Sequence, residues 1–355
     1  MRKMPEKSFN PSRKAPSSFP LDISVPVLLL IFYEEWLQER RKEWAPLSEA
    51  AVHAGFQPIV SSWETLTIAD GMVRAGEAFT YRKETEEFVK TSGIVFQPDV
   101  VMTTWGTSGY YELFKQIVAT GAYHSEYSLI AGLDGKCELE RCLRNYERQT
   151  GHSVSRPITW LSDELLQKEH QPKPGAGDFV ILKPSHSGQC KGIEIVSRAI
   201  LRDLARDAAE GKRPPFVIQE LVGNVFLYQN RRWDIRVNVL ATSLSPLRYQ
   251  RSTQGVAKTT GAPVSPGSIE LEQWLNAESF LAGRPPAENL SMSDMLDYLT
   301  DEYRLLFENF WLQVDEIVRQ TFSAIALQAE KENLPLDRAF MYPGFDFMLE
   351  RDDKT

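Results

Sequence analysis

The first third of the chain alternates apolar, strand-like runs with helix-like segments, and this alternation constrains the fold more than any other feature. The runs Val25–Tyr33, Gln57–Ser61 and Asp99–Thr104 predict strands, and helices are expected at Pro46–Ala54, Glu84–Lys90 and Gly109–Thr120, the last with Ser108 as its N-cap. Because strands that alternate with helices form βαβ units, residues 21–127 are expected to build a parallel, Rossmann-like sheet. No Gly-x-Gly-x-x-Gly motif follows the first strand, so the dinucleotide-binding fingerprint is absent. A sheet with no ligand of its own is the alternative.

The apolar run Val25–Tyr33 follows a basic start, as the apolar part of a signal peptide would. The run is too short to span a bilayer, and charged residues rather than a small-residue cleavage site come after it. A buried parallel strand explains it better, since such strands read as continuous apolar runs. We therefore expect a disordered basic tail over residues 1–20 and a cytoplasmic protein with no membrane partner.

Charge and cysteine content argue against several classes of function. The formal net charge is −8, from 40 Lys and Arg against 48 Asp and Glu. This balance disfavours a general nucleic-acid binder, because such proteins neutralise phosphates with a basic face. Cys137, Cys142 and Cys190 form no CxxC pair, and an odd number of cysteines gives no disulfide framework. Reduced thiols are expected, and two of these cysteines alone make a poor zinc site.

From about residue 128 the pattern changes to a helix followed by a β-rich region. The Pro- and Gly-rich segment 168–177 predicts a loop within this region. The expected helices are Lys136–Gln149, Ile200–Glu210 and one or two within Met292–Lys331. The expected strands are Asp178–Lys183, Gly192–Val196, Phe216–Glu220, Trp233–Thr242, Leu247–Arg251 and Gly344–Leu349. The whole chain is therefore expected to be of the α/β (α+β) class.

The segment Phe179–Val196 carries the strongest chemical signal. It reads as a strand that ends at Lys183, a loop of small residues that includes Gly188 and Gly192, and a second strand. A lysine at a strand end supplies a point charge for polyphosphate, and loop amides without bulky side chains can approach the phosphate oxygens. This is not a Walker A loop, because no Gly-Lys-Ser/Thr opens a helix. An ordinary surface lysine at a hairpin is the structural alternative.

Gln219, Glu220 and Leu221 stand at the end of the strand Phe216–Glu220. Backbone amide and carbonyl groups at this point could read the edge of an adenine while Leu221 packs on its face. A strand that runs into a polar turn explains the same residues equally well.

The next strand places Arg232, Asp234, Arg236 and Asn238 on one face, and only apolar residues on the other. Such a face suits a charged cleft, where arginines meet phosphate or carboxylate oxygens. Ion pairing across an exposed sheet remains the structural alternative.

Asp346 interrupts an otherwise apolar strand between Phe345 and Phe347. A carboxylate is costly to bury unless it is paired or bound to a metal. Magnesium, which binds carboxylates together with substrate phosphates, is the natural partner.

In chain order these motifs are Lys-Pro-Ser with a Gly-x-x-x-Gly loop, Ile-Gln-Glu, Trp-Asp-Ile-Arg-Val, Thr-Ser-Leu-Ser-Pro-Leu-Arg and Gly-Phe-Asp-Phe-Met-Leu. Together they resemble the tubulin-tyrosine-ligase-like branch of the ATP-grasp enzymes over about Leu133–Leu349. The resemblance implies an ATP-grasp fold that a Rossmann-like domain precedes. It further implies a central nucleotide-binding subdomain over residues 128–222 and a C-terminal catalytic subdomain over residues 223–355.

The resemblance also implies roles for particular residues. Lys136 and Lys183 match the two nucleotide lysines, and Gln219, Glu220 and Leu221 match the hinge around adenine, with Gly188 and Gly192 in the phosphate loop. Asp234 and Arg236 match the Asp-x-Arg of the nucleotide and substrate site, Lys258 stands where the family has an arginine, and Asp346 matches the first magnesium carboxylate. The implied cofactors are ATP and Mg²⁺.

This chain departs from the family pattern at three places. Arg232 replaces the lysine that commonly stands two residues before the aspartate of Asp-x-Arg, and Lys258 replaces an arginine. The sequence given ends at Thr355, where the family continues with a Glu-x-Asn strand that completes the magnesium site. We therefore expect either a truncated chain or an incomplete metal site, in which Glu350, Asp352 or Asp353 would be poor substitutes.

The implied reaction is ATP-dependent joining of a carboxylate to an amine through an acyl phosphate. A charge of −8 disfavours an acidic tubulin tail as the substrate and favours a small amino acid or peptide. The alternative from another class is a degenerate ATP-grasp module that binds nucleotide without ligase turnover. A carboxylate kinase, or a ligase that acts on an unrelated metabolite, is the third.

Overall fold

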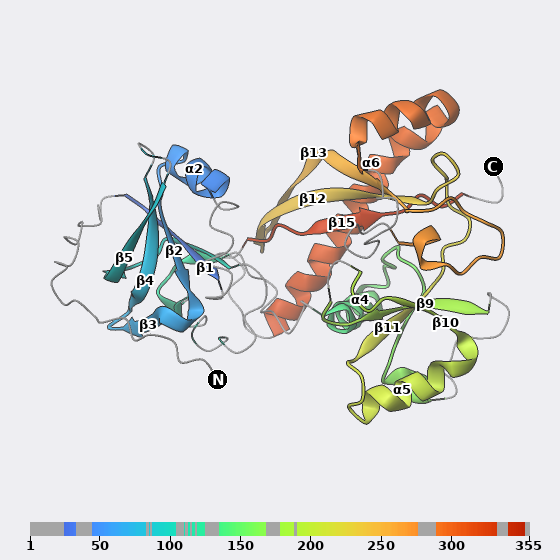
Figure 1. The fold of residues 1–355 in the computed structure, drawn as a ribbon, viewed down its shortest axis with the longest axis horizontal. Coiled ribbons are helices and arrows are strands. Elements are labelled where there is room, and N and C mark those ends of the chain that lie inside the picture. The colour runs from blue at the N-terminus through green and yellow to red at the C-terminus, as the bar shows by residue number, and fades with distance from the viewer. Residues whose placement is uncertain are drawn as a thin grey trace, which may run out of the picture. The chain divides into compact units, whose positions relative to one another are not determined.

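A computed structural model gives the fold (Figure 1). It describes residues 25–32, 45–82, 85, 87–103, 110, 113, 116–117, 119–124, 135–167, 178–187, 190–275, 289–331 and 340–351. The chain divides into two units, Met1–Tyr123 and His124–Thr355. No helix in these ranges is long and apolar enough to cross a membrane.

The first unit is built around a mixed sheet. Strand β1 (Val27–Phe32) lies between β2 (Gln57–Ser62) and β6 (Val100–Thr103) and runs parallel to both. The sheet continues from β2 through β4 (Met72–Arg82), which also pairs with β3 (Leu66–Ala69) and β5 (Glu87–Phe96), all antiparallel. The short β7 (Tyr123–His124) follows β6 in the strand order, and the 3-10 turn Trp63–Thr65 joins β2 to β3.

Helix α2 (Ala45–His53) covers part of this sheet. Its Ala51 packs with Leu28, Leu30, Val60 and Phe79 in one buried cluster. Gly55 follows the helix with φ +85°, a left-handed conformation that glycine adopts without steric cost. The predicted helix at 46–54 and its glycine end are therefore confirmed.

The all-parallel interpretation of this unit is wrong at one edge. Only the β2-β1-β6 part is parallel, as the alternation predicted. Residues 87–90 of the predicted helix Glu84–Lys90 belong instead to strand β5, Glu87–Phe96. The sequence signal for an antiparallel hairpin in this unit is Asp70-Gly71, which was missed. These two residues, with φ values of 54° and 72°, form the tight turn between β3 and β4. Most of the predicted helix Gly109–Thr120, with its cap Ser108, lies outside the described residues.

The second unit contains two four-stranded sheets. The first has the order β10-β9-β11-β8, and all its pairs are antiparallel. Its strands are β8 (Thr159–Leu161), β9 (Phe179–Pro184), β10 (Glu194–Ser197) and β11 (Phe216–Glu220).

Two helices pack on opposite faces of this sheet. Helix α5 (Leu201–Ala209) buries Leu201 and Ala205 against Val180, Leu182, Phe216 and Ile218, with the 3-10 turns Glu164–Leu166 and Arg198–Ile200 nearby. Helix α4 (Lys136–Thr150) places Cys137 against Leu161 and Val217, which belong to the other face.

The second sheet has the order β14-β13-β12-β15. Its strands are β12 (Trp233–Leu244), β13 (Leu247–Thr259), β14 (Asn289–Ser291) and β15 (Gly344–Phe347), and a 3-10 turn, Leu271–Gln273, follows β13. The long helix α6 (Met292–Lys331) crosses the strands of this sheet (Figure 1). The apolar face of β12, which includes Ile235 and Val237, is buried in the same cluster as Val318 and Phe322 of α6.

The strands and helices predicted for the second unit are confirmed, and the fold is mixed α/β, consistent with an ATP-grasp-like arrangement. Three details differ from the prediction: β8 and β14 were not foreseen, and β13 extends to Thr259. Residues 292–331 form one helix, the first of the two arrangements that the pattern allowed. The predicted loop 168–177 and the tail 1–20 lie outside the described residues, and the proposed subdomain boundary at residue 222 stays a prediction.

Candidate nucleotide site

Lys136 lies at the start of α4, directly against the loop that follows β9. Its ammonium donates hydrogen bonds to the carbonyl oxygens of Pro184 (3.1 Å) and Ser187 (2.5 Å), and its backbone N–H donates to Ser185 (3.1 Å). A Cβ at Gly135 would overlap with Glu138 Oε2 and stand 2.7 Å from the Ser185 hydroxyl oxygen, so a larger residue here would displace these side chains. The helix start and the loop are thereby fixed to each other.

Ser185 is the residue in this contact that sequence reasoning missed. It is fully buried, and its hydroxyl donates to the Glu138 carboxylate at 3.0 Å and accepts from the backbone N–H of Cys137 at 3.2 Å. It follows Lys-Pro in the sequence, and nothing in that Lys-Pro-Ser motif distinguishes a structural serine from one that binds ligand.

Lys183, at the end of β9, donates a hydrogen bond to Oε1 of Gln219 on β11 at 2.7 Å. Burial lowers the pKa of Lys183, and the nearby Lys136 ammonium lowers it further. The Cys190, Asp346 and Asp234 side chains partly oppose this lowering of the pKa, so these groups lie within electrostatic reach of Lys183. Burial likewise lowers the pKa of Lys136.

The second sheet contributes a charged face. Arg236 on β12 lies directly opposite Asp346 on β15, and its Nε is 2.7 Å from Asp346 Oδ1. Lys258 on β13 approaches the same carboxylate oxygen at 3.8 Å. The hydrogen bond that Arg236 donates to the Asp346 carboxylate raises the pKa of Arg236 above its ordinary value. The alternation predicted for β12 is confirmed, since Asp234 and Arg236 are partly exposed while Trp233, Ile235 and Val237 are buried.

The residues predicted around the phosphate loop and hinge have mixed outcomes. Gly192 has φ +71°, and a Cβ there would meet Pro184 Cγ at 3.0 Å, so this position requires glycine. Gly188 lies outside the described residues. Glu220 ends β11 with its side chain 3.4 Å from Arg198, and Leu221 directly after it is partly exposed. The nucleotide contacts predicted for all of these residues stay predictions.

Asp346 is ion-paired rather than grouped with other carboxylates. Within the described ranges, no cluster of three or more His, Cys, Asp or Glu side chains has the placement of a metal site. Glu350 is exposed, and Asp352 and Asp353 lie outside those ranges. The groups that contact Asp346 are thus cations, Arg236 and Lys258. Asp346 could bind Mg²⁺ only if Arg236 moved to other oxygens.

Arg232, which replaces the family's lysine, makes a contact that was not predicted. Its guanidinium stacks on the Trp274 ring at 3.7 Å from the ring centroid and donates to the carbonyl oxygen of Val222 at 2.8 Å. Burial lowers the pKa of Arg232. The stacking ties the segment after β11 to the segment after β13, and no lysine could reproduce its planar geometry.

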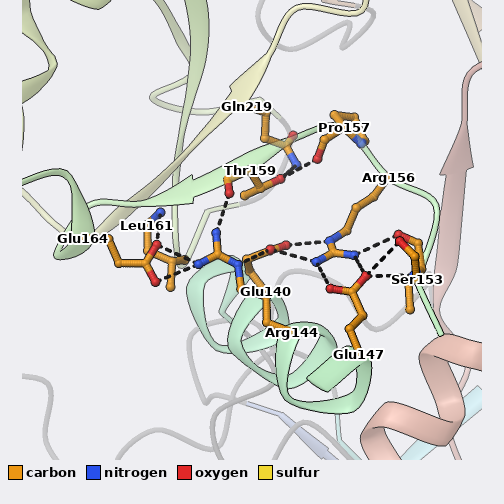
Figure 2. A network of polar contacts seen from close by, with 11 residues as sticks. Glu140, Arg144, Glu147, Ser153, Arg156, Pro157, Thr159, Leu161, Glu164 and Gln219 are labelled. Carbon is orange, nitrogen blue, oxygen red and sulfur yellow. Dashed lines mark hydrogen bonds and ion pairs between the residues drawn. The ribbon is translucent and has the colours of Figure 1, made fainter. Parts of the chain in front are cut away.

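A network of arginines and carboxylates joins helix α4 to the segment that contains strand β8 in the second unit (Figure 2). Arg144 contacts Glu140 at 2.8 Å and Glu164 at 2.7 Å, and Arg156 contacts Glu140 at 2.9 Å and Glu147 at 2.7 Å. Glu140, Arg144 and Glu147 belong to the predicted helix Lys136–Gln149, and no sequence motif pointed to Arg156 or Glu164. Glu140 is nevertheless only 5 % exposed, and only the fold reveals that the network is partly buried.

The arrangement brings cationic groups from α4 and both sheets of the second unit to one place. Burial lowers the pKa of both Lys136 and Lys183, and the Lys136 ammonium lowers that of Lys183 further, so an anionic ligand with several oxygens would fit there. A phosphate-binding role for this arrangement stays a prediction.

Comparison with known families agrees with this class. The model of the tubulin-tyrosine ligase family matches residues 136–263, which is less than half of the chain. The match confirms the resemblance that the motifs predicted, so this part of the chain is tubulin-tyrosine-ligase-like, and the family consists in general of ATP-dependent ligases of the ATP-grasp type. The matched segment begins at Lys136 and ends before Asp346. No curated protein matches the chain.

Proposed function

We propose that this protein is an ATP- and Mg²⁺-dependent ligase that joins a carboxylate to an amine, with a small amino acid or peptide as substrate. The observation that supports it is the convergence of Lys136 and Lys183 on the loop after β9, within electrostatic reach of the face that carries Asp234 and Asp346. The family match over residues 136–263 supports the same reading.

In this proposal, each charged group has a separate task. Lys136 and Lys183 hold the phosphate chain of ATP, and Gln219, Glu220 and Leu221 contact the adenine. The substrate carboxylate attacks the γ-phosphorus, the bond to the β-phosphate oxygen breaks, and ADP leaves. The amine then attacks the acyl phosphate, which releases inorganic phosphate and leaves an amide after loss of a proton.

Arg236 and Lys258 would neutralise charge on the reacting oxygens, since phosphoryl transfer depends on positioning and on electrostatic stabilisation rather than on a protein nucleophile. Asp346 would hold magnesium, which would neutralise the phosphate oxygens. The net charge of −8 is the reason to favour a small substrate over an acidic tubulin tail.

The test is phosphate release from Mg-ATP with a panel of amino acids, dipeptides and an acidic tubulin-tail peptide. The expected result is amine-dependent release with a small substrate, and mass spectrometry should find the amide product. Release that needs a carboxylate but no amine would instead support a carboxylate kinase.

A second candidate is a module that binds ATP without turnover. One observation favours it: the predicted metal carboxylate, Asp346, is held by Arg236 and Lys258. Tight ATP binding together with no phosphate release for any substrate in the panel would support this candidate against the ligase.

A further inference from the structure

We propose that Thr159 is a positioning residue, which fixes the orientation of the Gln219 side-chain amide so that its carbonyl oxygen faces Lys183. The expected effect on nucleotide binding rests on the proposed function, whereas the geometry around Thr159 does not depend on that function. Thr159 lies on β8, a strand that no motif pointed to, and it is the direct cross-strand neighbour of Gln219.

The direction of each hydrogen bond carries the argument. The Thr159 hydroxyl donates to the carbonyl oxygen of Pro157 at 2.8 Å, so its proton is committed there. Its oxygen can then only accept, and it accepts from Nε2 of Gln219 at 3.0 Å. Once Nε2 is directed to Thr159, Oε1 of the same amide must point away from it, and Lys183 donates to this oxygen at 2.7 Å.

The reverse orientation of the amide is excluded by chemistry. It would place the Gln219 amino group against the Lys183 ammonium, and both groups are only donors. It would also place Oε1 against a hydroxyl oxygen whose proton is already used by Pro157. Thr159 and the Lys183 ammonium therefore together select one of two amide orientations of equal shape.

Thr159 is itself fixed by a hydrogen bond to its backbone carbonyl group. It is buried, and its carbonyl oxygen accepts a hydrogen bond from Arg144 (Figure 2). Arg144 is fixed in turn by Glu140 and Glu164, at 2.8 and 2.7 Å. The partly buried ion network behind the sheet thereby supports the strand that orients Gln219.

The consequence concerns the charge on Lys183. Gln219 gives the Lys183 ammonium its neutral acceptor, while burial and the Lys136 ammonium favour the uncharged amine. The other groups that act on Lys183 are Cys190, Asp234 and Asp346, which favour the charged form. Loss of the acceptor should therefore make Lys183 lose its proton at lower pH.

The experiment compares Thr159→Val with Thr159→Ser. Valine keeps the β-branched shape but removes the hydroxyl, whereas serine keeps the hydroxyl. In the nucleotide-free protein, competitive acylation followed by mass spectrometry measures how Lys183 reactivity rises with pH. Thr159→Val should become reactive at lower pH than the wild type, and Thr159→Ser should follow the wild type. Overlapping curves for wild type and Thr159→Val would overturn the proposal.

A double-mutant cycle with Gln219→Glu separates orientation from a general structural role. A carboxylate presents an oxygen to Lys183 in either orientation, so Thr159→Val should shift the Lys183 curve much less in the Gln219→Glu background. Equal shifts in both backgrounds would mean that Thr159 acts through the strand and not through the amide.

Binding of Mg-ATP supplies the link to function. Thr159→Val should raise the Kd by about fivefold or more, because a hydrogen bond to a charged group would be lost from the site. If the wild type binds no nucleotide while the acylation curves still differ, the proposed function fails and the role of Thr159 stands. If the wild type binds nucleotide and the acylation curves coincide, the role of Thr159 is refuted and nucleotide binding by the protein stands.

Discussion

Arg236 and Asp346 are direct cross-strand neighbours on β12 and β15, with Nε of the guanidinium 2.7 Å from Oδ1 of the carboxylate. Both side chains are 42 % exposed, so solvent weakens the pair and it should stabilise the fold by no more than about 1 kcal/mol. A pair so weakly held can exchange its partners for ligand oxygens and a metal ion. We expect its function to lie in that exchange.

Asp346→Asn tests this exchange. The amide keeps the shape of the side chain but loses the charge that would hold magnesium, and it frees Arg236. We expect ligase turnover to fall by more than about tenfold, with ATP affinity changed by less than about threefold, because lost metal stabilisation acts mainly on charge that develops in the transition state. Steady-state phosphate release and calorimetry measure the two quantities. A change in affinity as large as the change in turnover would place Asp346 in ground-state binding instead.

Binding of ATP should be accompanied by proton uptake at alkaline pH. The pKa of Lys183 is lowered by burial and by Lys136, so this amine is partly uncharged at pH values below the ordinary lysine range. A phosphate chain favours the ammonium and raises its pKa again, so the complex binds more protons than the free protein. Calorimetry near pH 9 in buffers of different ionisation enthalpy measures the uptake. It should shrink in Lys183→Met, and proton release in the wild type would contradict the assignment.

The same lowered pKa has a consequence for stability. The unfolded state holds its proton up to the ordinary lysine pKa, whereas the folded state loses it earlier, so unfolding takes up a proton between the two values. The free energy of unfolding should therefore rise with pH in this alkaline window, and the contribution of Lys183 should be unfavourable at neutral pH. Urea unfolding from pH 7 to 10 checks the sign: Lys183→Met should flatten this rise, and an unchanged slope would mean that Lys183 is not desolvated in solution.

Gly192→Ala should destabilise the loop after β9 by about 1–3 kcal/mol. The residue has φ +71°, and the new Cβ would meet Pro184 Cγ at 3.0 Å, so backbone strain and a close contact add together. Gly151→Ala is the matched control, since φ there is +73° with nothing within 4 Å of a new Cβ. Urea unfolding should show a larger loss for Gly192→Ala than for Gly151→Ala. Equal losses of unfolding free energy in the two variants would show that the Pro184 contact does not contribute to the destabilisation.

The sequence predicted the second unit better than the first, for a physical reason. Strict alternation along β12 exposes Arg236 on one face and buries Ile235 on the other, and this pattern identifies a strand with little ambiguity. In the first unit, β5 has mixed polarity over Glu87–Phe96, and its pairing with β4 depends on a hairpin rather than on a periodic pattern.

The site was predictable where a motif fixed it and not where the fold alone creates the contact. Lys183 and Gln219 were both singled out, yet their direct hydrogen bond follows from the register of β9 and β11, which no local pattern encodes. Thr159 and Trp274 had no signal at all, because each acts through a neighbour that is distant in sequence.

The central claim is that Lys183 binds the phosphates of ATP, and calorimetry of Mg-ATP binding to the wild type and to Lys183→Ala tests it most directly. A charge-assisted contact of this kind contributes about 1.5–3 kcal/mol, so the Kd should rise by roughly 10- to 150-fold in the variant. Lys212→Ala is the control, because Lys212 lies on the surface with its side chain 64 % exposed and should leave the Kd unchanged. Equal affinity of wild type and Lys183→Ala for Mg-ATP, or no binding by the wild type, would contradict the account.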